Sequence, residues 1–279
     1  MSTVSKSGPR RRPPDDADPF RLGWRYVTVR RPDGTEVSEQ VPLTAEDVLF
    51  PEEGDFIVQT DYHSIDMAYL LTLFRAWLAD DPDALALSDC RVDWNIPGVR
   101  PLGPDLAVFS GVGPRHGEIA TFDLAAEGAR PVLVIEITSP ATRKNDLGIK
   151  GDFYHRAGVP LYVIADATED PGGGRRLELI AYRYAAAGYR KVKPDARGWI
   201  PLAPLGLSLG VVRDERTDCD RLACFDAKTG EEVGDYTAVS RALAAEAAAR
   251  AEAEARAAEA EARIRELEEA LRRLGPAPS

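Results

Sequence analysis

Residues 131–138 read Pro-Val-Leu-Val-Ile-Glu-Ile-Thr, a run that is apolar except for Glu136 and the closing Thr138. Such a nearly continuous apolar run is typical of a central β-strand that is covered on both faces. A carboxylate in this setting is costly to bury unless it is paired with a cation or binds a metal. Glu136 is therefore a candidate functional residue, with a structural ion pair at the strand end as the alternative.

Strand and helix patterns alternate on either side of this run. Short strands are expected around residues 84–88, 105–109 and 161–165, and residues 62–79 read as an amphipathic helix. The apolar side chains that define the expected face of that helix are Ile65, Tyr69, Leu70, Leu73, Phe74 and Trp77. With a second helix at about 143–157, the order is helix, three strands, helix, strand. That order predicts an α/β core with at least one crossover connection.

Asp105 supplies a second acid, at the start of the 105–109 strand and directly after Pro104. Pro-Asp commonly opens a strand from a turn, so Asp105 alone is a weak indication of a site. Two carboxylates on neighbouring strands nevertheless suit Mg²⁺, which usually takes one or two protein carboxylates and completes its shell with water and phosphate. Asp105 and Glu136 together therefore predict a Mg²⁺ site, at which Mn²⁺ is a possible substitute.

The helix expected at 143–157, which Gly158 and Pro160 would end, contributes a lysine. With 3.6 residues per turn, one of its faces carries Arg143, Asp146, Leu147, Lys150, Tyr154 and Ala157. We expect the apolar members of this face to pack on the sheet, which turns Lys150 inward. A buried ammonium needs a nearby anion, and the carboxylate pair would provide it. The alternative is an exposed Asp146–Lys150 pair, which is worth only a few tenths of a kcal/mol.

Residues 141–156 also form a locally basic segment. They carry two acids against four cationic side chains, which leaves +2 in a chain of net charge −11; the cations are Arg143, Lys144, Lys150 and Arg156. An acidic chain has no general attraction for nucleic-acid phosphates. Any contact with nucleic acid must therefore depend on such a local patch and on a metal. An ordinary solvated helix surface would have the same composition.

Composition argues against several other classes of protein. The sequence has no stretch of 18 apolar residues, so no membrane-spanning helix is expected. Cys90, Cys219 and Cys224 show neither a zinc-ligand spacing with the three histidines nor the pattern of a disulfide framework. These features predict a cytoplasmic protein.

Composition also divides the chain into three segments. Residues 1–20 are rich in Pro, Arg and Asp and lack the apolar stretch of a secretory signal, so they read as a disordered tail. Residues 21–238 hold the α/β core with added β-strands, expected at 24–30 and within the strand-rich stretch 175–227. Residues 239–279 begin with a long helix that is rich in alanine and charge.

That C-terminal helix, at about 239–274, carries the seam of a coiled coil. Apolar residues recur at alternating steps of four and three, namely Ala253, Ala257, Ala260, Ile264, Leu267, Leu271 and Leu274. Between Ser240 and Leu274 the helix has eight glutamates and seven arginines. A partner helix of a second subunit, a groove on another protein, or the chain's own domain would cover the seam. The first of these predicts a homodimer.

In this order, these residues resemble the PD-(D/E)xK nuclease superfamily, and more specifically the Uma-two family of restriction endonucleases. The resemblance is carried by Pro104-Asp105, by VLVIEITSPATRKND at 132–146, by Lys150, and by YHRAGVPLYVIAD at 154–166. Looser similarity extends back to the helix opening at His63 and forward to LACFDAKTGEEV at 222–233.

Two positions depart from the pattern of these families. Thr138 stands where the superfamily usually has a lysine, two residues after the glutamate. In the Uma-two family the lysine lies on the following helix, which is where Lys150 stands. Leu161 replaces a glutamate that often precedes the aromatic residue, a position to which we assign no chemistry.

The resemblance implies a restriction-endonuclease-like fold and a metal-dependent endonuclease that hydrolyses DNA phosphodiester bonds. It implies that Asp105 and Glu136 hold Mg²⁺ and that Lys150 completes the catalytic set. In supporting roles, Asp146 would orient Lys150, and the Thr138 region would add a backbone carbonyl. DNA would be received near Arg143, Lys144 and Lys150.

Two other functions fit the same sequence. The first is a catalytically inactive module of the same fold that binds or assembles through its C-terminal helix. The second is a metal-dependent nuclease that acts on RNA or on small nucleotides. His63 on the first helix could approach the site, although a lone histidine is more often structural.

Overall fold

The computed structural model describes residues 18–113, 117–214, 217–234 and 236–274. The chain forms two compact units, Met1–Val233 and Gly234–Ser279. Most of the expected tail, residues 1–17, lies outside the described residues.

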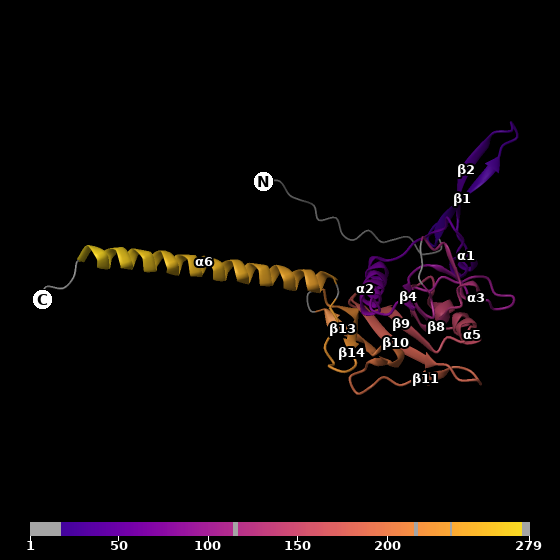
Figure 1. Ribbon diagram of the computed structural model, residues 1–279. Helices are drawn as coiled ribbons and strands as arrows, with labels where there is room; N and C mark the ends of the chain where they lie inside the picture. Colours follow the sequence, from indigo (N-terminus) through magenta and orange to yellow (C-terminus); the bar gives the residue numbers. More distant parts are fainter. Residues whose placement is uncertain (1–17, 114–116, 215–216, 235, 275–279) are drawn as a thin grey trace. The chain divides into compact units, whose positions relative to one another are not determined.

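A six-stranded mixed sheet lies at the centre of the first unit (Figure 1), in the order β11-β10-β9-β8-β6-β4. Strands β8 and β9 run parallel, and the other neighbours run antiparallel. The strands are β4 (Ala84–Leu87), β6 (Leu106–Ser110), β8 (Arg130–Ile137), β9 (Leu161–Glu169), β10 (Arg175–Arg183) and β11 (Arg190–Val192). The parallel pair needs a crossover, and helices α4 (Arg143–Asp146) and α5 (Ile149–Arg156) provide it.

The two faces of β8 serve two different hydrophobic clusters, because successive side chains of a strand point to opposite sides. Leu133, Ile135 and Ile137 belong to the cluster that includes helix α2 (Asp61–Trp77). Val134 belongs to the cluster on the other face, which includes Tyr154 of α5. Glu136 has the same parity as Val134, so its carboxylate faces α5.

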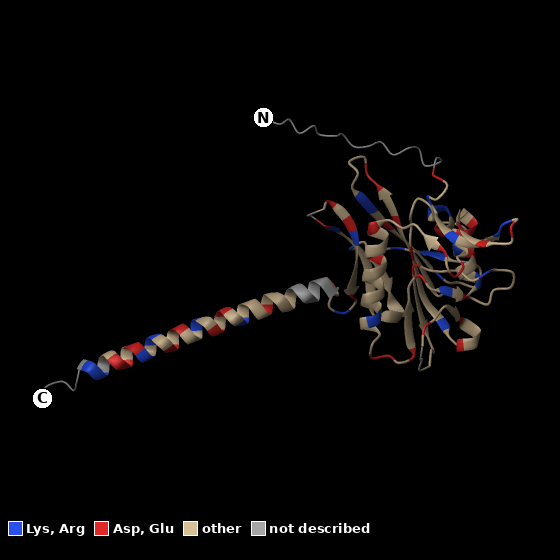
Figure 2. Cartoon of the chain, turned by 90° about the horizontal axis from the view of Figure 1, so that it is seen from above, with Lys and Arg blue, Asp and Glu red and all other residues tan. Residues whose placement is uncertain are grey.

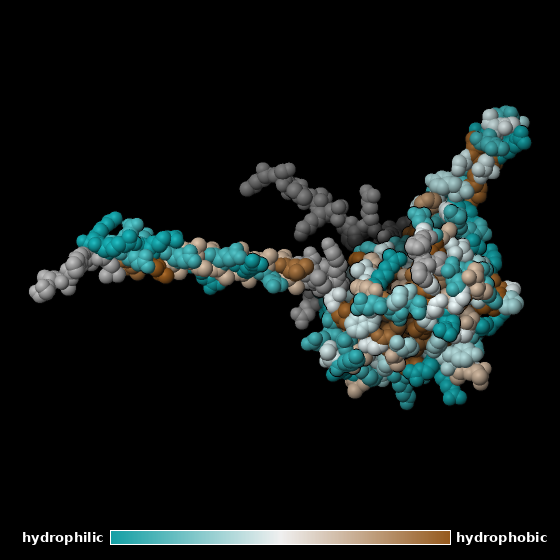
Figure 3. Space-filling model, in the orientation of Figure 1, coloured by the Kyte–Doolittle hydropathy of each residue, from teal (hydrophilic) through white to brown (hydrophobic). Residues whose placement is uncertain are grey.

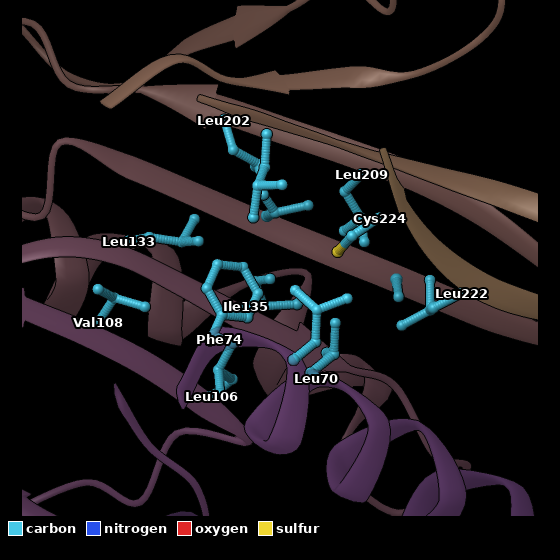
Figure 4. Packing of buried hydrophobic residues seen from close by; sticks show 14 of the residues in the cluster. Leu70, Phe74, Leu106, Val108, Leu133, Ile135, Leu202, Leu209, Leu222 and Cys224 are labelled. Atoms are coloured by element: carbon cyan, nitrogen blue, oxygen red, sulfur yellow. The ribbon is translucent and has the colours of Figure 1, made fainter. Parts of the chain in front are cut away.

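Helix α2 and a second, three-stranded antiparallel sheet cover the first face of the central sheet. The strands of the second sheet are β12 (Ile200–Leu202), β13 (Leu207–Asp214) and β14 (Cys219–Asp226), and a 3₁₀ turn, η2 (Ala203–Leu205), follows β12. In Figure 4, Leu70 and Phe74 of α2 lie beside Leu106 and Ile135. Leu209 and Cys224 close the cluster from the second sheet.

The buried face of α2 includes the expected Leu70, Leu73 and Phe74, with Tyr69 and Trp77 packed against the same cluster, and departs from the expected face at Ile65. Ile65 is 59% exposed, whereas Met67, Leu70, Leu73 and Phe74 are buried. The reason is the helical period: steps of four residues advance by 400°, so a stripe that starts at Ile65 drifts away from the sheet. Steps that mix three and four residues keep Leu70 and Phe74 in phase.

Phe74 offers a direct test of this packing. Its side chain is fully buried, so Phe74→Ala should lower the free energy of unfolding by about 3–5 kcal/mol. The exposed Ile65→Ala should change it by less than about 0.5 kcal/mol. Denaturant unfolding measures both, and equal effects would contradict the assigned face.

The expected single helix at 143–157 is two helices. Gly148 interrupts it with φ −127° and ψ −103°, outside the helical region. As a consequence, Leu147 is 37% exposed instead of packing on the sheet, Ala157 is half-buried, and Tyr154 is fully buried. A side chain at Gly148 would bring its Cβ to 2.9 Å from the Lys144 carbonyl oxygen, so the break needs glycine.

Smaller elements complete the first unit. A hairpin of β1 (Gly23–Arg30) and β2 (Glu36–Pro42) extends away from the central sheet in Figure 1 and pairs with the short β3. The remaining elements are β3 (Phe56–Ile57), α1 (Ala45–Leu49), β5 (Arg91–Asp93), β7 (Thr121–Asp123) and α3 (Leu124–Glu127). The unit is thus mixed α/β with several sheets. The order helix, three strands, helix, strand is present with β5, β7 and α3 inserted.

The second unit is built on one helix, α6 (Tyr236–Leu274), of 39 residues. The side chains of residues 242–270 are exposed. Figure 3 shows a mainly hydrophilic surface along this helix, with isolated apolar side chains. Among the described residues, none of the helices combines the length and apolarity that crossing a membrane requires.

Candidate active site

Asp105 and Glu136 meet because their strands are neighbours. Leu106 of β6 pairs with Ile135 of β8, which places Asp105 beside the end of β8 that carries Glu136. Asp105 Oδ2 accepts a hydrogen bond from the backbone N–H of Ile137 at 2.7 Å. The main chain of β8 therefore holds the Asp105 carboxylate, which precedes β6.

Glu136 is completely buried, and both of its oxygens have a neighbour of complementary charge or polarity. The Tyr154 hydroxyl donates to Oε1 at 2.5 Å. The Lys150 ammonium lies 2.9 Å from Oε2. Both partners come from α5, so the crossover helix that the parallel pair requires also carries the groups that compensate the buried acid.

Lys150 points inward, and its side chain is almost inaccessible to water. Only 7% of the residue is exposed, and Nζ lies 2.7 Å from Asp146 Oδ1 as well as near Glu136. Asp146 is buried too, and its backbone carbonyl accepts a hydrogen bond from the Tyr162 hydroxyl at 2.7 Å. The exposed Asp146–Lys150 pair that we considered as an alternative is not what the fold forms.

The cluster contains more acid than base. Asp105, Glu136 and Asp146 surround one lysine, and burial raises the pKa of Glu136 to about 8, with Asp105 and Asp146 adding to the effect. Burial also raises the pKa of Asp146. Burial alone would lower the pKa of Lys150, but the surrounding carboxylates raise it, so the ammonium keeps its proton. With His63 beside Asp105, the cluster holds three acids against two basic side chains.

His63 at the start of α2 joins this site. Its Nε2 lies 3.2 Å from Asp105 Oδ1, and the residue is buried. Burial lowers the pKa of His63, but the hydrogen bond to Asp105 and the other acids outweigh it, so the net shift is upward. Burial likewise raises the pKa of Asp105, but the contact with His63 outweighs the effect of burial, so the net shift of this pKa is downward. Each of the two groups therefore favours the charged form of the other.

A small cavity of about 40 Å³ adjoins the cluster, and its lining includes His63, Asp89, Asp105 and Lys150. Asp89 has a positive φ of 51°, which is uncommon outside glycine. Burial raises its pKa, and the charge on Asp105 adds to this. The sequence did not indicate Asp89 as a site residue, because the residues around it have the composition of an ordinary turn. A larger pocket of about 790 Å³ also borders Asp89. Its other acids, Glu52, Glu53, Asp55 and Glu118, outnumber Arg75 and Arg91 in its lining, which disfavours a phosphate ligand.

Thr138 and Arg143 connect the crossover to β9. The Thr138 hydroxyl donates to Asp166 at 2.9 Å and accepts from the Ala167 N–H at 2.8 Å. Arg143 forms two hydrogen bonds with the same Asp166 carboxylate, at 2.7 and 2.8 Å. These contacts fix the loop that follows Glu136.

Only some of the cations in the basic segment 141–156 are free to contact a ligand. Lys150 is buried among acids, Arg143 is bound to Asp166, and Arg156 donates to the Pro97 carbonyl at 2.9 Å. Lys144 is exposed at the same end of the crossover. Of the four cations, Arg143, Lys144 and Arg156 are thus exposed, and only Lys150 is buried.

Oxygen ligands dominate the cluster, which suits a hard divalent cation. Across the described residues, no group of three or more His, Cys, Asp or Glu side chains is already arranged around a metal position. Mg²⁺ does not need such a group, because one or two carboxylates with water and phosphate suffice. Asp105 and Glu136 are the pair that could hold it, and the excess of acid around them favours a cation.

The raised pKa of Glu136 predicts a pH dependence of stability in the presence of EDTA. A carboxyl group whose pKa is raised on folding contributes stability that is fully present below its unfolded pKa, near 4.5, and is lost as pH rises toward about 8. Over this interval the wild type should therefore lose stability relative to Glu136→Gln, which does not titrate. Denaturant unfolding at a series of pH values measures the difference, and a difference independent of pH would refute the shift.

The chain was also compared with known proteins. The crystal structure of a "putative nuclease belonging to DUF820" from Anabaena variabilis ATCC 29413 is similar to 55% of this chain and 80% of its own, with 21% identity and a TM-score of 0.39. No curated protein matches the chain. The sequence model of the Uma2 family, described as "Putative restriction endonuclease", matches residues 52–214. Because this match spans more than half of the chain and includes Asp105, Glu136 and Lys150, the chain belongs to the Uma2 family.

Proposed function

We propose that this protein is a Mg²⁺-dependent endonuclease that hydrolyses DNA phosphodiester bonds, with Mn²⁺ as a substitute ion. Membership of a family described as restriction endonucleases supports a nuclease. The observation that carries the proposal is the buried cluster in which Glu136 and Asp146 share Lys150 while Asp105 pairs with His63, beside a small cavity. A purely structural ion pair would not need the excess of buried acid.

Asp105 and Glu136 would hold the ion, and a backbone carbonyl after Glu136 could add a further oxygen. Mg²⁺ in this position would supply Lewis acidity toward a phosphate oxygen and would activate a water molecule. The lining of the cavity brings His63, Asp105 and Lys150 to one space. A reacting phosphate entering there would meet the lysine and the ion-binding acid together.

Lys150 would stabilise the negative charge that develops on the phosphate, because its raised pKa keeps it cationic. Its neighbours act as positioning residues. Asp146 holds the ammonium, Tyr154 holds Glu136, and His63 holds Asp105. Fixed partners of this kind keep the reactive groups in place without reorganisation during the reaction.

DNA would approach from the side of the crossover on which Lys144 and Arg143 are exposed. With a net charge of −11, the protein needs such a local contact together with the ion to bind a phosphate backbone. These two cations contribute to phosphate binding but do not read base sequence.

A plasmid-nicking assay over a titration of Mg²⁺ and Mn²⁺ tests the function. Nicking that depends on the ion supports the proposal. Cleavage of RNA but not DNA would show that the substrate is RNA and not DNA. A purified, folded protein that cleaves neither nucleic acid would favour the catalytically inactive module.

A further inference from the structure

Helix α6 carries a heptad repeat over its whole length. The steps of three and four that begin at Ala253 continue toward the N-terminus of the helix without a change of phase. The a positions are Tyr236, Leu243, Arg250, Ala257, Ile264 and Leu271, and the d positions are Val239, Glu246, Ala253, Ala260, Leu267 and Leu274. The seam is thus apolar at both ends and polar at Glu246 and Arg250.

The positions that flank this seam are sorted by the sign of their charge. The e positions between 254 and 268 are all acidic, namely Glu254, Glu261 and Glu268. The g positions include no acid, and the two charged ones are Arg256 and Arg263. All five side chains are exposed, and Figure 2 shows both signs of charge along the helix.

This sorting distinguishes between two orientations of a helix pair. In a parallel pair, each g residue faces the e residue five positions later on the partner helix. Arg256 then meets Glu261 of the other copy, and Arg263 meets Glu268, on both sides of the seam. In an antiparallel pair, e faces e and g faces g, so every contact among these residues is between like charges.

We propose that α6 binds α6 of a second copy of this chain as a parallel, in-register coiled coil. Leu243, Ile264 and Leu267 are each more than half exposed in the single chain, so the pair would bury side chains that water now surrounds. The alanines at Ala253, Ala257 and Ala260 would allow the two helices to approach closely but add little apolar area. The proposal does not depend on nuclease activity.

Polar residues inside the seam would set the register. A charged residue at an a position lowers the stability of a coiled coil and disfavours pairings that place it against an apolar layer. Arg250 meets this description and binds Glu254 of its own helix at 2.9 Å. A shifted register would place Arg250 against leucine or alanine.

Ion pairs within each helix do not oppose this pairing. Arg256 lies 3.7 Å from Glu252, and Arg263 lies 2.9 Å from Glu266, both on the same helix. Exposed pairs of this kind contribute little to stability, so the arginines can exchange or share partners when a second helix arrives. Parallel pairing also brings both copies of the first unit to the same end of the coil, because each is joined to the start of α6.

The test uses the full chain in analytical ultracentrifugation over a concentration series. The wild type should dimerise reversibly, and R256E/R263E should raise the dissociation constant at least about tenfold. R265E/R272E makes the same change of net charge at positions outside the seam, and its dissociation constant should stay within about threefold of the wild type. A wild type that remains a monomer, or a dimer that R256E/R263E leaves intact, would overturn the proposal.

Cysteine cross-linking tests the orientation. L243C and L267C, made singly, should each form disulfide-linked dimers, because in a parallel, in-register coil each position faces itself. An antiparallel pair can bring at most one of these positions against its own copy. The unsubstituted chain, with Cys90, Cys219 and Cys224, is the control and should not cross-link. Cross-linking of one variant alone, or of neither, would overturn the parallel arrangement.

Discussion

Glu136→Gln and Lys150→Ala should each lower Mg²⁺-dependent nicking of supercoiled DNA by about a hundredfold or more. Glu136→Gln removes a carboxylate that would hold the ion while keeping the shape of the side chain. Lys150→Ala removes the cation nearest to that carboxylate, at 2.9 Å. Loss of either group leaves the developing charge on the phosphate without one of its fixed partners. Initial rates at saturating Mg²⁺ measure the effect.

Two matched variants separate this loss from a general effect of substitution. Glu178 and Lys191 lie exposed on β10 and β11, so Glu178→Gln and Lys191→Ala should retain the wild-type rate. Lys150→Ala also leaves Glu136 and Asp146 buried without their cation, which destabilises the fold. Lys150→Met, which keeps most of the side-chain volume, should be equally inactive. Wild-type rates in a folded Lys150→Met would remove Lys150 from the chemistry.

Divalent ions should raise the melting temperature of the wild type, independently of any substrate. Binding to the folded state alone at one hundred times the dissociation constant stabilises it by about 2.7 kcal/mol. For a unit of roughly 200 residues this corresponds to an increase of about 5–10 °C. The physical cause is the excess of buried carboxylate, which a cation would relieve.

Asp105→Asn should abolish most of this thermal shift, because Asp105 is one of the two proposed ligands. Glu178→Gln should leave it unchanged. Titration with MgCl₂ or MnCl₂, followed by differential scanning calorimetry with KCl at matched ionic strength as a reference, measures the shift. An equal shift in Asp105→Asn and in the wild type would place the ion elsewhere, even if nicking were observed.

Local patterns in the sequence determined much of the first unit. The apolar run at 131–137 predicted a strand buried on both faces, because alternate side chains have no solvent side to occupy. The same parity that buries Val134 turns Glu136 toward α5. Lys150 and Tyr154 lie one turn apart, so helical periodicity alone predicted that they share a face. These relations connect residues that are close along the chain.

The helix break at Gly148 and the exposure of Ile65 at the start of α2 required the tertiary structure. Expected apolar contacts at Leu147 and Ile65 are not formed, since both side chains are exposed. Leu147 is exposed because the helix breaks at Gly148, whereas the pattern of α2 was compatible with more than one rotation of the helix about its axis. The fit of Leu70 and Phe74 against the sheet selects the rotation of α2.

The sequence by itself predicted, from the apolar strand, the helix face and the resemblance to the Uma-two family, that Asp105, Glu136 and Lys150 form one site. Only the tertiary structure decided their neighbours: His63 beside Asp105, Asp89 at the cavity, and Tyr154 on Glu136. The physical reason is that the register of β6 against β8, and the packing of α2, set the distances between residues that are far apart in the chain. The charged groups that meet in this way shift the pKa values of one another, and no local pattern in the sequence predicts those shifts.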